Sequence, residues 1–216
     1  MPKRRTASGS DRETLLAEAA LRFLKKQDWR TMTLASVARL ARLPLSDVLS
    51  ILSSKSALPG FVLRMLAKET ARRHTANGRS ADPRERLFDA TMTFFDVQEI
   101  HATALKKLYR ALQYDPPTLL ATRNDILHLA GELLALAEAD IGLSPRVQAA
   151  IFAGILIRAV SVWRDDDKEL GKTMAQLDGD LRRVERLLWS KPENADVPRS
   201  PKPQSELGGR SFKKRN

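Results

Sequence analysis

Residues 33–55 read TLASVARLARLPLSDVLSILSSK, and this stretch decides the fold. Apolar residues recur at helical spacing on both sides of a break at residues 40–43. Thr33 is suited to cap the first of two short helices, because its side-chain oxygen accepts from the unpaired amides of an opening turn. Pro44 suits the first turn of the second helix, where its missing N–H has no intrahelical partner. Two short helices around a tight turn make a helix-turn-helix, which lays its second helix in the DNA major groove.

This stretch, with the residues before it, resembles the N-terminal domain of TetR-type bacterial transcriptional regulators. The resemblance starts at residues 16–24, LAEAALRFL, runs through residues 29–34, WRTMTL, and ends at residues 54–58, SKSAL. It covers about fifty of the 216 residues without a gap. The resemblance implies an all-α fold: an N-terminal three-helix helix-turn-helix domain followed by a C-terminal helical domain for ligand binding and dimerisation.

The chain departs from the family pattern at several positions. Arg42 stands where the family has glycine, and Pro44 stands where it has serine. Leu49 replaces a tyrosine that touches phosphate in the family, so a hydroxyl donor is lost. Lys55 is kept, at a position where the family lysine approaches the DNA backbone. The candidate DNA-contacting residues that the resemblance implies are Arg4, Arg5, Thr33, Arg42, Leu45, Ser46, Leu49, Ser50 and Lys55.

The composition favours a globular protein of the reducing cytoplasm. Hydrophobic residues make up 43% of the chain, which is enough to build a core. The chain has no cysteine, so disulfides, thiolate chemistry and cysteine-ligated zinc are excluded. No apolar run approaches the roughly 20 residues that cross a bilayer, and the basic N-terminus lacks the apolar segment of a secretory signal. We therefore expect a cytoplasmic protein.

A net charge of +11 favours polyanionic partners, either nucleic acid or an anionic membrane surface. Residues 1–12 contain four basic and one acidic side chain, and residues 191–216 contain seven and three, so these two ends carry +7. We expect residues 1–9 to form a disordered basic arm and residues 190–216 a disordered basic tail. Two interpretations stay open for these ends: solvated segments that aid solubility, or arms that contact DNA.

Breaker residues divide the rest of the chain. Residues 77–83 read NGRSADP, so we predict a helix-turn-helix domain with its connecting helix over residues 10–76 and a second domain over residues 83–189. The resemblance implies that the last two long helices of the second domain pair with those of another subunit. Their apolar stripes would suit the core of a monomer equally well. The helices predicted in the second domain cover residues 83–97, 99–113, 118–140, 145–164 and 168–189.

Large apolar residues of the second domain are candidates for contact with a small hydrophobic ligand, although helical spacing of such residues is what a plain core requires. Arg158 lies on the apolar stripe of the fourth of these helices. Three interpretations of it stay open: a carboxylate partner across a dimer interface, an acidic effector, or a guanidinium that reaches water from the edge of the stripe. The candidate ligand-binding residues are Phe88, Met92, Phe95, Leu108, Tyr109 and Leu127.

Catalytic, metal-binding and cofactor-binding motifs are absent from the sequence. It contains no GxGxxG, GxxxxGK[ST], GxSxG or HExxH pattern, so no enzyme activity and no cofactor are expected. His74, His101 and His128 fall on three separate predicted helices, at no spacing typical of metal ligands.

Two functions from different classes follow. The first is a TetR-type regulator, a homodimer that binds double-stranded DNA and is released by a small hydrophobic ligand, as a ligand-responsive repressor is. The alternative is a lipid-binding or membrane-associated accessory protein that no longer binds DNA. Residues 162–178 loosely resemble TetR-fold lipid-binding proteins of ubiquinone biosynthesis, and only this alternative involves a membrane.

Overall fold

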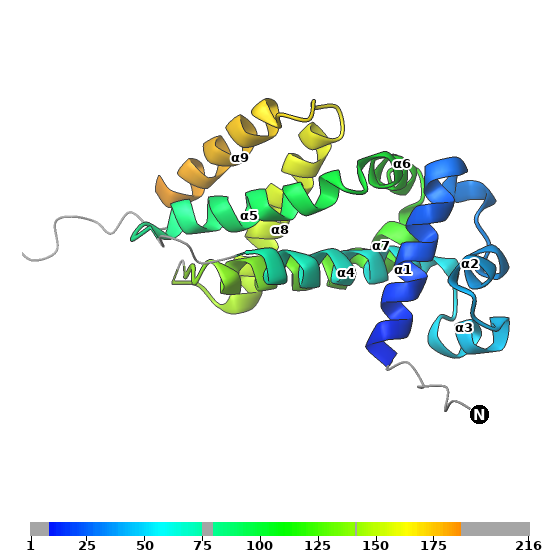
Figure 1. Ribbon diagram of the computed structural model, residues 1–216. Helices are drawn as coiled ribbons and strands as arrows, with labels where there is room; N and C mark the ends of the chain where they lie inside the picture. Colours follow the sequence, from blue (N-terminus) through cyan, green and yellow to red (C-terminus); the bar gives the residue numbers. More distant parts are fainter. Residues whose placement is uncertain (1–8, 75–79, 141, 187–216) are drawn as a thin grey trace, which may run out of the picture.

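The computed structural model describes residues 9–74, 80–140 and 142–186, and these residues contain helices and no strand. The predicted all-α fold class is therefore confirmed. The two basic ends lie outside the described residues, except that Gly9 begins the first helix instead of ending an arm. The helices are α1 (Gly9–Lys26), α2 (Leu34–Ala41), α3 (Leu45–Ile51), α4 (Leu58–Arg73), α5 (Pro83–Glu99), α6 (Ala102–Leu112), α7 (Pro116–Leu136), α8 (Pro145–Trp163) and α9 (Gly171–Val184), with 3-10 turns η1 (Trp29–Thr31) and η2 (Lys55–Ala57) (Figure 1).

Helices α2 and α3 form the predicted helix-turn-helix. Thr33 Oγ1 accepts from the Ser36 backbone N–H at 3.1 Å, and Ser36 Oγ accepts from the Thr33 N–H at 3.1 Å. This capping box satisfies two amides that have no intrahelical partner. Arg42 ends α2 in the left-handed conformation, at φ 56° and ψ 38°, which usually selects glycine. The arginine therefore makes the turn that glycine makes in the family.

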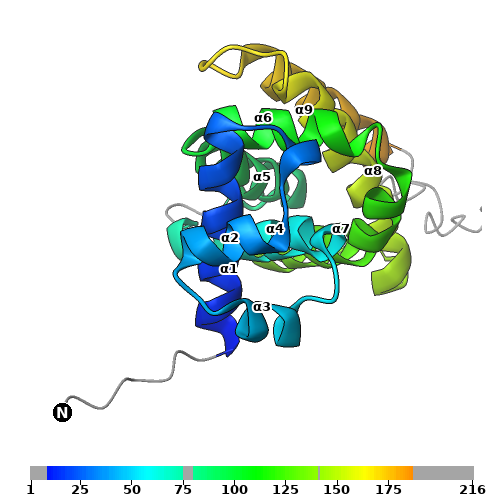
Figure 2. The same ribbon diagram turned by 90° about the vertical axis from the view of Figure 1, so that its right-hand side faces the viewer.

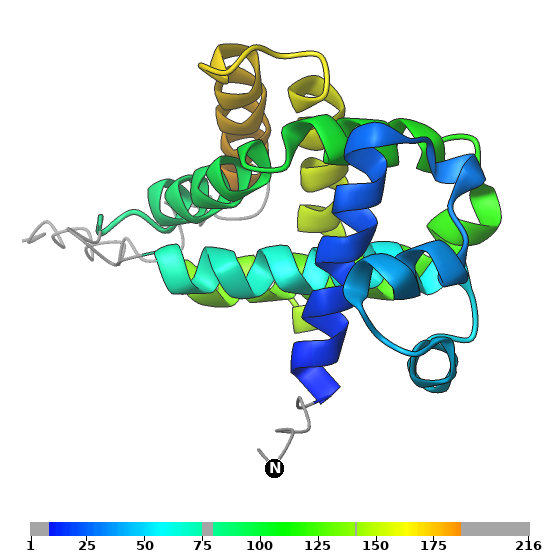
Figure 3. The ribbon, with the colours of Figure 1, turned by 45° about the vertical axis from the view of Figure 1, so that its right-hand side comes forward.

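Helix α3 packs mainly against α2 and stands clear of the rest of the molecule. Figures 2 and 3 show it at the lower edge, away from α5, α8 and α9. Val48 faces inward and is fully buried, which attaches α3 through one side only. Among the described residues, none covers the opposite side of α3, where Leu45 and Leu49 are exposed.

Helix α4 connects the helix-turn-helix to the C-terminal helices. It packs against α1 and α7, and it runs alongside α7 in Figure 1. A Cβ atom at Gly60 would overlap the carboxylate of Asp125 on α7, so glycine allows this close approach. Pro59 lies in the first turn of α4, where the absence of its N–H breaks no helical hydrogen bond.

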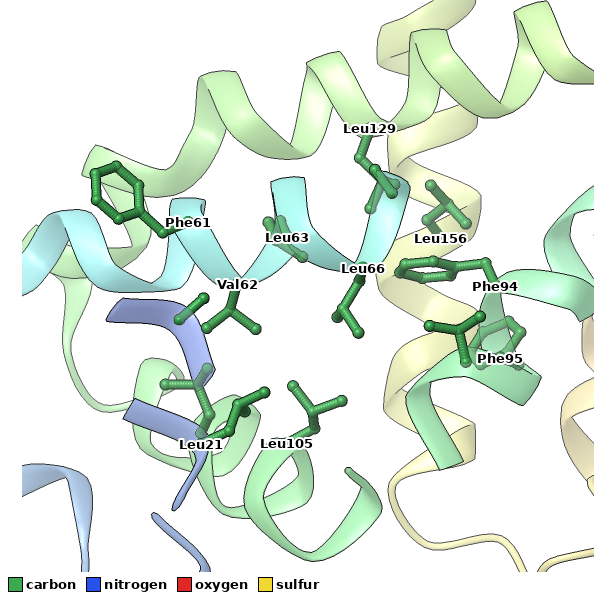
Figure 4. Packing of buried hydrophobic residues seen from close by; sticks show 14 of the residues in the cluster. Leu21, Phe61, Val62, Leu63, Leu66, Phe94, Phe95, Leu105, Leu129 and Leu156 are labelled. Atoms are coloured by element: carbon green, nitrogen blue, oxygen red, sulfur yellow. The ribbon is translucent and has the colours of Figure 1, made fainter. Parts of the chain in front are cut away.

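One hydrophobic core extends through both ends of the molecule. Leu21 of α1, Leu66 of α4 and Phe94 of α5 are all buried, and Figure 4 shows Leu66 between Leu21 on one side and Phe94 with Leu156 of α8 on the other. Each fully buried side chain of this size contributes about 1.5–3 kcal/mol. Packing is thus continuous across the predicted domain boundary, whose residues 75–79 lie outside the described chain.

The buried side of α7 is only partly apolar. Leu120 is 64% exposed and Leu127 is 38% exposed, whereas Leu129 and Leu133 are buried. The buried stripe includes Thr122, whose hydroxyl donates to the Thr118 carbonyl oxygen at 2.8 Å. A hydroxyl that is satisfied within its own helix can be buried without a hydrogen-bond partner on another helix.

The last helix begins later than predicted, at Gly171 instead of residue 168. Asp166 is buried, and its carboxylate accepts from the backbone N–H and the hydroxyl of Thr173 at 2.7 and 2.8 Å. Burial alone would raise the pKa of Asp166, but these hydrogen bonds outweigh it and lower the pKa. The predicted last turns of this helix, beyond residue 186, lie outside the described residues.

By length and composition alone, α8 is the one described helix that could cross a membrane. It packs against α7 and α9, and about half of it is buried within the chain. An apolar core helix of a helical bundle has the same properties, so this is weak evidence for a membrane span.

Candidate functional site

The outer side of α3 brings together four of the predicted DNA-contacting residues. Leu45, Ser46, Leu49 and Ser50 are exposed and follow one another at helical spacing, so they share one face. Leu45 is 43% exposed and Leu49 is 53% exposed. The Ser50 hydroxyl donates to the Asp47 carbonyl oxygen at 2.8 Å, within the helix. We call these four residues the α3 face.

The α3 face has almost no positive charge. Helix α3 contains no lysine or arginine, and its one charged residue is Asp47. Arg39 and Arg42, at the end of α2, are exposed beside it. Thr33 is exposed, and its side chain is engaged in the cap of α2. Arg4 and Arg5 lie outside the described residues.

The structure places Lys55 against the body of the protein, which corrects the prediction that it reaches outward. Its Nζ donates to the Trp29 carbonyl oxygen at 3.1 Å and lies 4.9 Å from the centre of the Trp29 ring. The ammonium therefore already has an acceptor and an aromatic face. These contacts use one of the three N–H donors of the ammonium and hold it beside Trp29.

Trp29 joins the helix-turn-helix to the start of α7. It is buried, as predicted, and its indole N–H donates to Asp115 Oδ2 at 3.0 Å. Asp115 also caps α7 by accepting from the Thr118 N–H at 3.2 Å, and the Thr118 hydroxyl reaches Ser56 Oγ at 3.0 Å. Hydrogen bonds from Trp29 and then Thr118 lower the pKa of Asp115. We call these four residues, Trp29, Ser56, Asp115 and Thr118, the junction.

A second set of contacts joins α4 to α1 and α7. Arg64 of α4 forms ion pairs with Asp125 of α7 and with Glu13 of α1, the latter at 3.3 Å. Its guanidinium also stacks 4.6 Å from the centre of the Phe61 ring. A shift of α7 relative to α4 would therefore be transmitted to α1.

A cavity of about 180 Å³ lies between α4, α6, α7 and α8. Most of its wall is apolar, and α4 contributes three residues to it. This location connects the cavity to the helix that carries the helix-turn-helix. The lining residues are Pro59, Val62, Leu63, Phe94, Leu108, Tyr109, Leu112, Gln113, Leu119, Thr122, Ile126, Leu129, Leu156, Ile157, Val160, Ser161 and Arg164.

Two of the predicted ligand-binding residues, Leu108 and Tyr109, line the cavity. Phe88, Met92 and Phe95 lie elsewhere: Phe95 is fully buried in the core, and the other two are half-buried against it. Leu127, on α7, is 38% exposed and does not line the cavity.

Sequence reasoning missed the other lining residues, above all those of α7 and α8. Thr122 and Arg164 are polar, so neither was considered a cavity residue. The usable signal was the spacing of Thr122, Ile126 and Leu129, which are four and then three residues apart and therefore share one side of a helix.

Tyr109 and Arg164 are the strongest hydrogen-bonding groups of the cavity wall. The Tyr109 hydroxyl donates to Oε1 of the fully buried Gln98 at 2.8 Å. Burial raises the pKa of Tyr109 above its ordinary value, so the phenol stays neutral. The hydroxyls of Thr122 and Ser161 donate to carbonyl oxygens of their own helices.

Arg158 has a partner within the chain. Its Nε lies 3.4 Å from Oδ2 of the buried Asp180 on α9, while its own side chain is mostly exposed. Asp180 also contacts Arg183 at 3.3 Å. Of the three interpretations, the guanidinium at the edge of the apolar stripe fits best, with its carboxylate partner on α9 instead of across an interface.

Comparison with known proteins identifies the fold. No family model and no curated protein matches the sequence. Among solved structures, the chain is similar to a TetR transcriptional regulator from Rhodococcus sp. RHA1, with a TM-score of 0.58, 11% identity, and coverage of 84% of this chain and 97% of the other. It is also similar to the multidrug binding protein EbrR complexed with imidazole, with a TM-score of 0.50, 17% identity, and coverage of 93% of this chain and all of the other. At these identities the likeness shows the fold, and the TetR-type fold predicted from residues 33–55 is confirmed.

Proposed function

We propose that this chain, which has the TetR-type fold, is a dimeric DNA-binding transcriptional regulator of the cytoplasm that responds to a small ligand. The observation that carries the proposal is the position of α3. It is the second helix of the helix-turn-helix, it stands clear of the body, and its outer face is uncovered. That geometry is what entry into a major groove requires. The proposal includes no catalytic role and no cofactor.

The proposed contact with double-stranded DNA would include few positively charged side chains. Arg39 and Arg42 flank the α3 face and would bind phosphate, and the basic residues before Gly9 would add to them. Leu45 and Leu49 would contact apolar base edges such as the thymine methyl group. With so few phosphate contacts, the affinity should fall with salt less steeply than in strongly basic regulators.

A gel-shift assay with the DNA upstream of the gene tests this proposal. We expect sequence-dependent retention that weakens as the salt concentration rises. Arg42→Ala should lower the affinity, and it should make the slope of log affinity against log salt concentration shallower by about one. The matched control is Arg123→Ala, which removes an exposed arginine from α7, far along the chain from the helix-turn-helix. Absence of retention at low salt, or equal retention of unrelated DNA, would contradict the proposal.

The proposed dimer forms through α8 and α9, as the fold suggests. The outer side of α8 leaves Val147, Gly154 and Ile157 exposed, and no described residue outside the backbone of α8 itself lies within 4 Å of a Cβ atom built at Gly154. A glycine in a helix interior costs about 1 kcal/mol against alanine, and no contact within the chain explains it. Close approach of a second copy would explain it.

Light scattering of the purified protein tests the dimer. Gly154→Arg should convert a dimer to a monomer, because it places a charged side chain where the helices meet. Ala121→Arg, at an exposed position of α7, is the matched control and should leave the mass unchanged. A wild-type protein that is monomeric at micromolar concentration would remove this part of the proposal.

The proposed response couples the cavity to α4. Three residues of α4, Pro59, Val62 and Leu63, border the cavity, and Arg64 links the same helix to α1 and α7. A ligand that expands the cavity would move α4, and this movement would change the distance between the two α3 helices of a dimer. The resulting release from DNA is the behaviour of a ligand-responsive repressor.

A second candidate function is favoured by the composition of the α3 face. Its exposed leucines, the lack of cations on α3, and Lys55 held against Trp29 would suit a protein that keeps the fold without binding DNA. Such a lipid-binding or membrane-associated accessory protein would bind liposomes of anionic phospholipid in a flotation assay and retain no DNA. Retention without flotation favours the regulator.

A further inference from the structure

Arg164 is the one cationic residue among the described residues that line the cavity, and one of its hydrogen-bond donors, Nε, has no partner among them. Its side chain is 17% exposed. The Nε atom is buried and has no hydrogen-bond acceptor. The guanidinium contacts Asp165 at 3.5 Å, the limit for a hydrogen bond, and Asp165 is held more closely by Arg110 at 3.0 Å.

A guanidinium that has a buried N–H without an acceptor and only one distant carboxylate partner is costly at an apolar wall. Arginine stays charged at any physiological pH, so it cannot relieve the cost by losing a proton. A buried charge is stabilised when an anion pairs with it and completes its hydrogen bonds. The other hydrogen-bonding groups of the wall do not supply that anion, because the Thr122 and Ser161 hydroxyls donate within their helices and Tyr109 stays neutral.

We infer that the cavity binds a small apolar carboxylic acid, with its carboxylate against Arg164 and its apolar body between α4, α7 and α8. Leu63, Ile126 and Leu129 would contact the apolar body. An arginine fork matches a carboxylate in two parallel hydrogen bonds, which gives specificity for acids over alcohols. The inference names the ligand class of the proposed regulator and rests on the ligand-binding role of this cavity.

The size of the cavity limits the ligand. An apolar cavity of about 150 Å³ binds benzene in another protein, so a cavity of this volume holds one aromatic ring or a short alkyl chain. Benzoate and hexanoate are therefore suitable probes. Their neutral counterparts, benzyl alcohol and 1-hexanol, have nearly the same shape and lack the charge.

Titration calorimetry on the full chain at pH 7 tests the inference. Benzoate or hexanoate should bind at least about tenfold more tightly than the matching alcohol, the preference that one charge-assisted hydrogen bond supplies. Arg164→Gln should remove this preference, and Arg164→Lys should keep part of it. Equal affinity of acid and alcohol for the wild type, or an unchanged preference in Arg164→Gln, would overturn the inference.

Thermal unfolding of Arg164→Gln shows whether a loss of binding reflects a loss of folding. Val160→Phe adds volume at the cavity wall, so it should weaken the binding of acid and alcohol together. Native mass spectrometry of the purified protein detects a ligand that is already bound. A bound acid supports the inference, and a bound amine or neutral molecule contradicts it.

The gel-shift assay keeps this inference distinct from the proposed function. If acids bind through Arg164 and DNA retention does not change, the ligand class stands and the ligand response fails. If no acid binds and the protein still retains its DNA, the regulator stands and the ligand class fails.

Discussion

The α3 face and the junction are neighbouring parts of the molecule with opposite character. The junction is partly buried and hydrogen-bonded: Trp29 donates to Asp115, and the neighbouring Lys55 donates to the Trp29 carbonyl oxygen. The α3 face is exposed and uncharged, with two leucines and two serines, and α3 contains one acidic and no basic side chain. One part positions the helix-turn-helix, while the other would make the contact with DNA.

This difference shows that the positioning of a reading helix and its chemistry can vary independently. The cap of α2, the left-handed turn at Arg42 and the buried Val48 hold α3 outward whatever residues occupy its outer side. Exposed residues contribute little to folding, so they can change without loss of the fold. The fold alone therefore does not settle whether α3 reads a base sequence.

The largest effect is expected at the centre of the junction. Trp29→Ala should destabilise the protein by about 3–5 kcal/mol, because it leaves a cavity and removes the donor to Asp115. Urea unfolding followed by circular dichroism measures this loss. A cost below about 1 kcal/mol would mean that the junction does not hold the two ends together.

Asp115 should show a smaller effect with a pH signature. Asp115→Ala should cost about 1–2 kcal/mol through loss of a helix cap and of the acceptor for Trp29. The pKa of Asp115 is lowered in the folded protein, so its stabilising contribution is present above the unfolded value of about 3.9 and is lost as pH falls through the folded pKa.

Urea unfolding between pH 2 and pH 7 checks that signature. The wild type should lose this part of its stability on the acid side, and Asp115→Ala should not. Asp115→Asn, which keeps an acceptor without the charge, should lie between them at pH 7. Parallel pH profiles for all three proteins would show that the carboxylate does not contribute.

Two glycines give effects of opposite sign and similar size. Gly60→Ala should destabilise the protein by about 1 kcal/mol, because the new Cβ displaces the Asp125 carboxylate from Arg64. Gly131→Ala, at an open position of α7, should stabilise it by up to about 1 kcal/mol through helix propensity. Thermal unfolding compares the two, and stabilisation by both would mean that α4 and α7 separate easily.

The smallest effect on stability is expected at the α3 face. Leu49→Lys should change the unfolding free energy by less than about 0.5 kcal/mol, because the side chain is mostly exposed. The same variant adds a cation to the proposed DNA contact, so gel-shift affinity should rise several-fold at low salt. No change in DNA affinity would place α3 away from the duplex and favour the accessory function.

The sequence predicted the reading unit more accurately than the cavity. Thr33 as the cap of the first short helix follows from local chemistry and is confirmed. Leu127 and Phe95 were assigned to a pocket from apolar spacing alone, and neither lines it. Apolar spacing identifies a buried side of a helix, but several neighbours compete for that side, and the spacing does not say which of them leaves a gap.

The sequence by itself determined the all-α class, the helix-turn-helix and the Thr33 cap of α2, because these depend on residues within a few positions of one another. Only the tertiary structure decided that Lys55 turns to Trp29, that α7 buries Thr122, and that Arg164 borders a cavity. These outcomes depend on which distant side chain is near enough to offer an acceptor or a surface. These neighbours are set only when the distant elements pack together: η1 with η2 for Lys55, and α4, α6, α7 and α8 for the cavity.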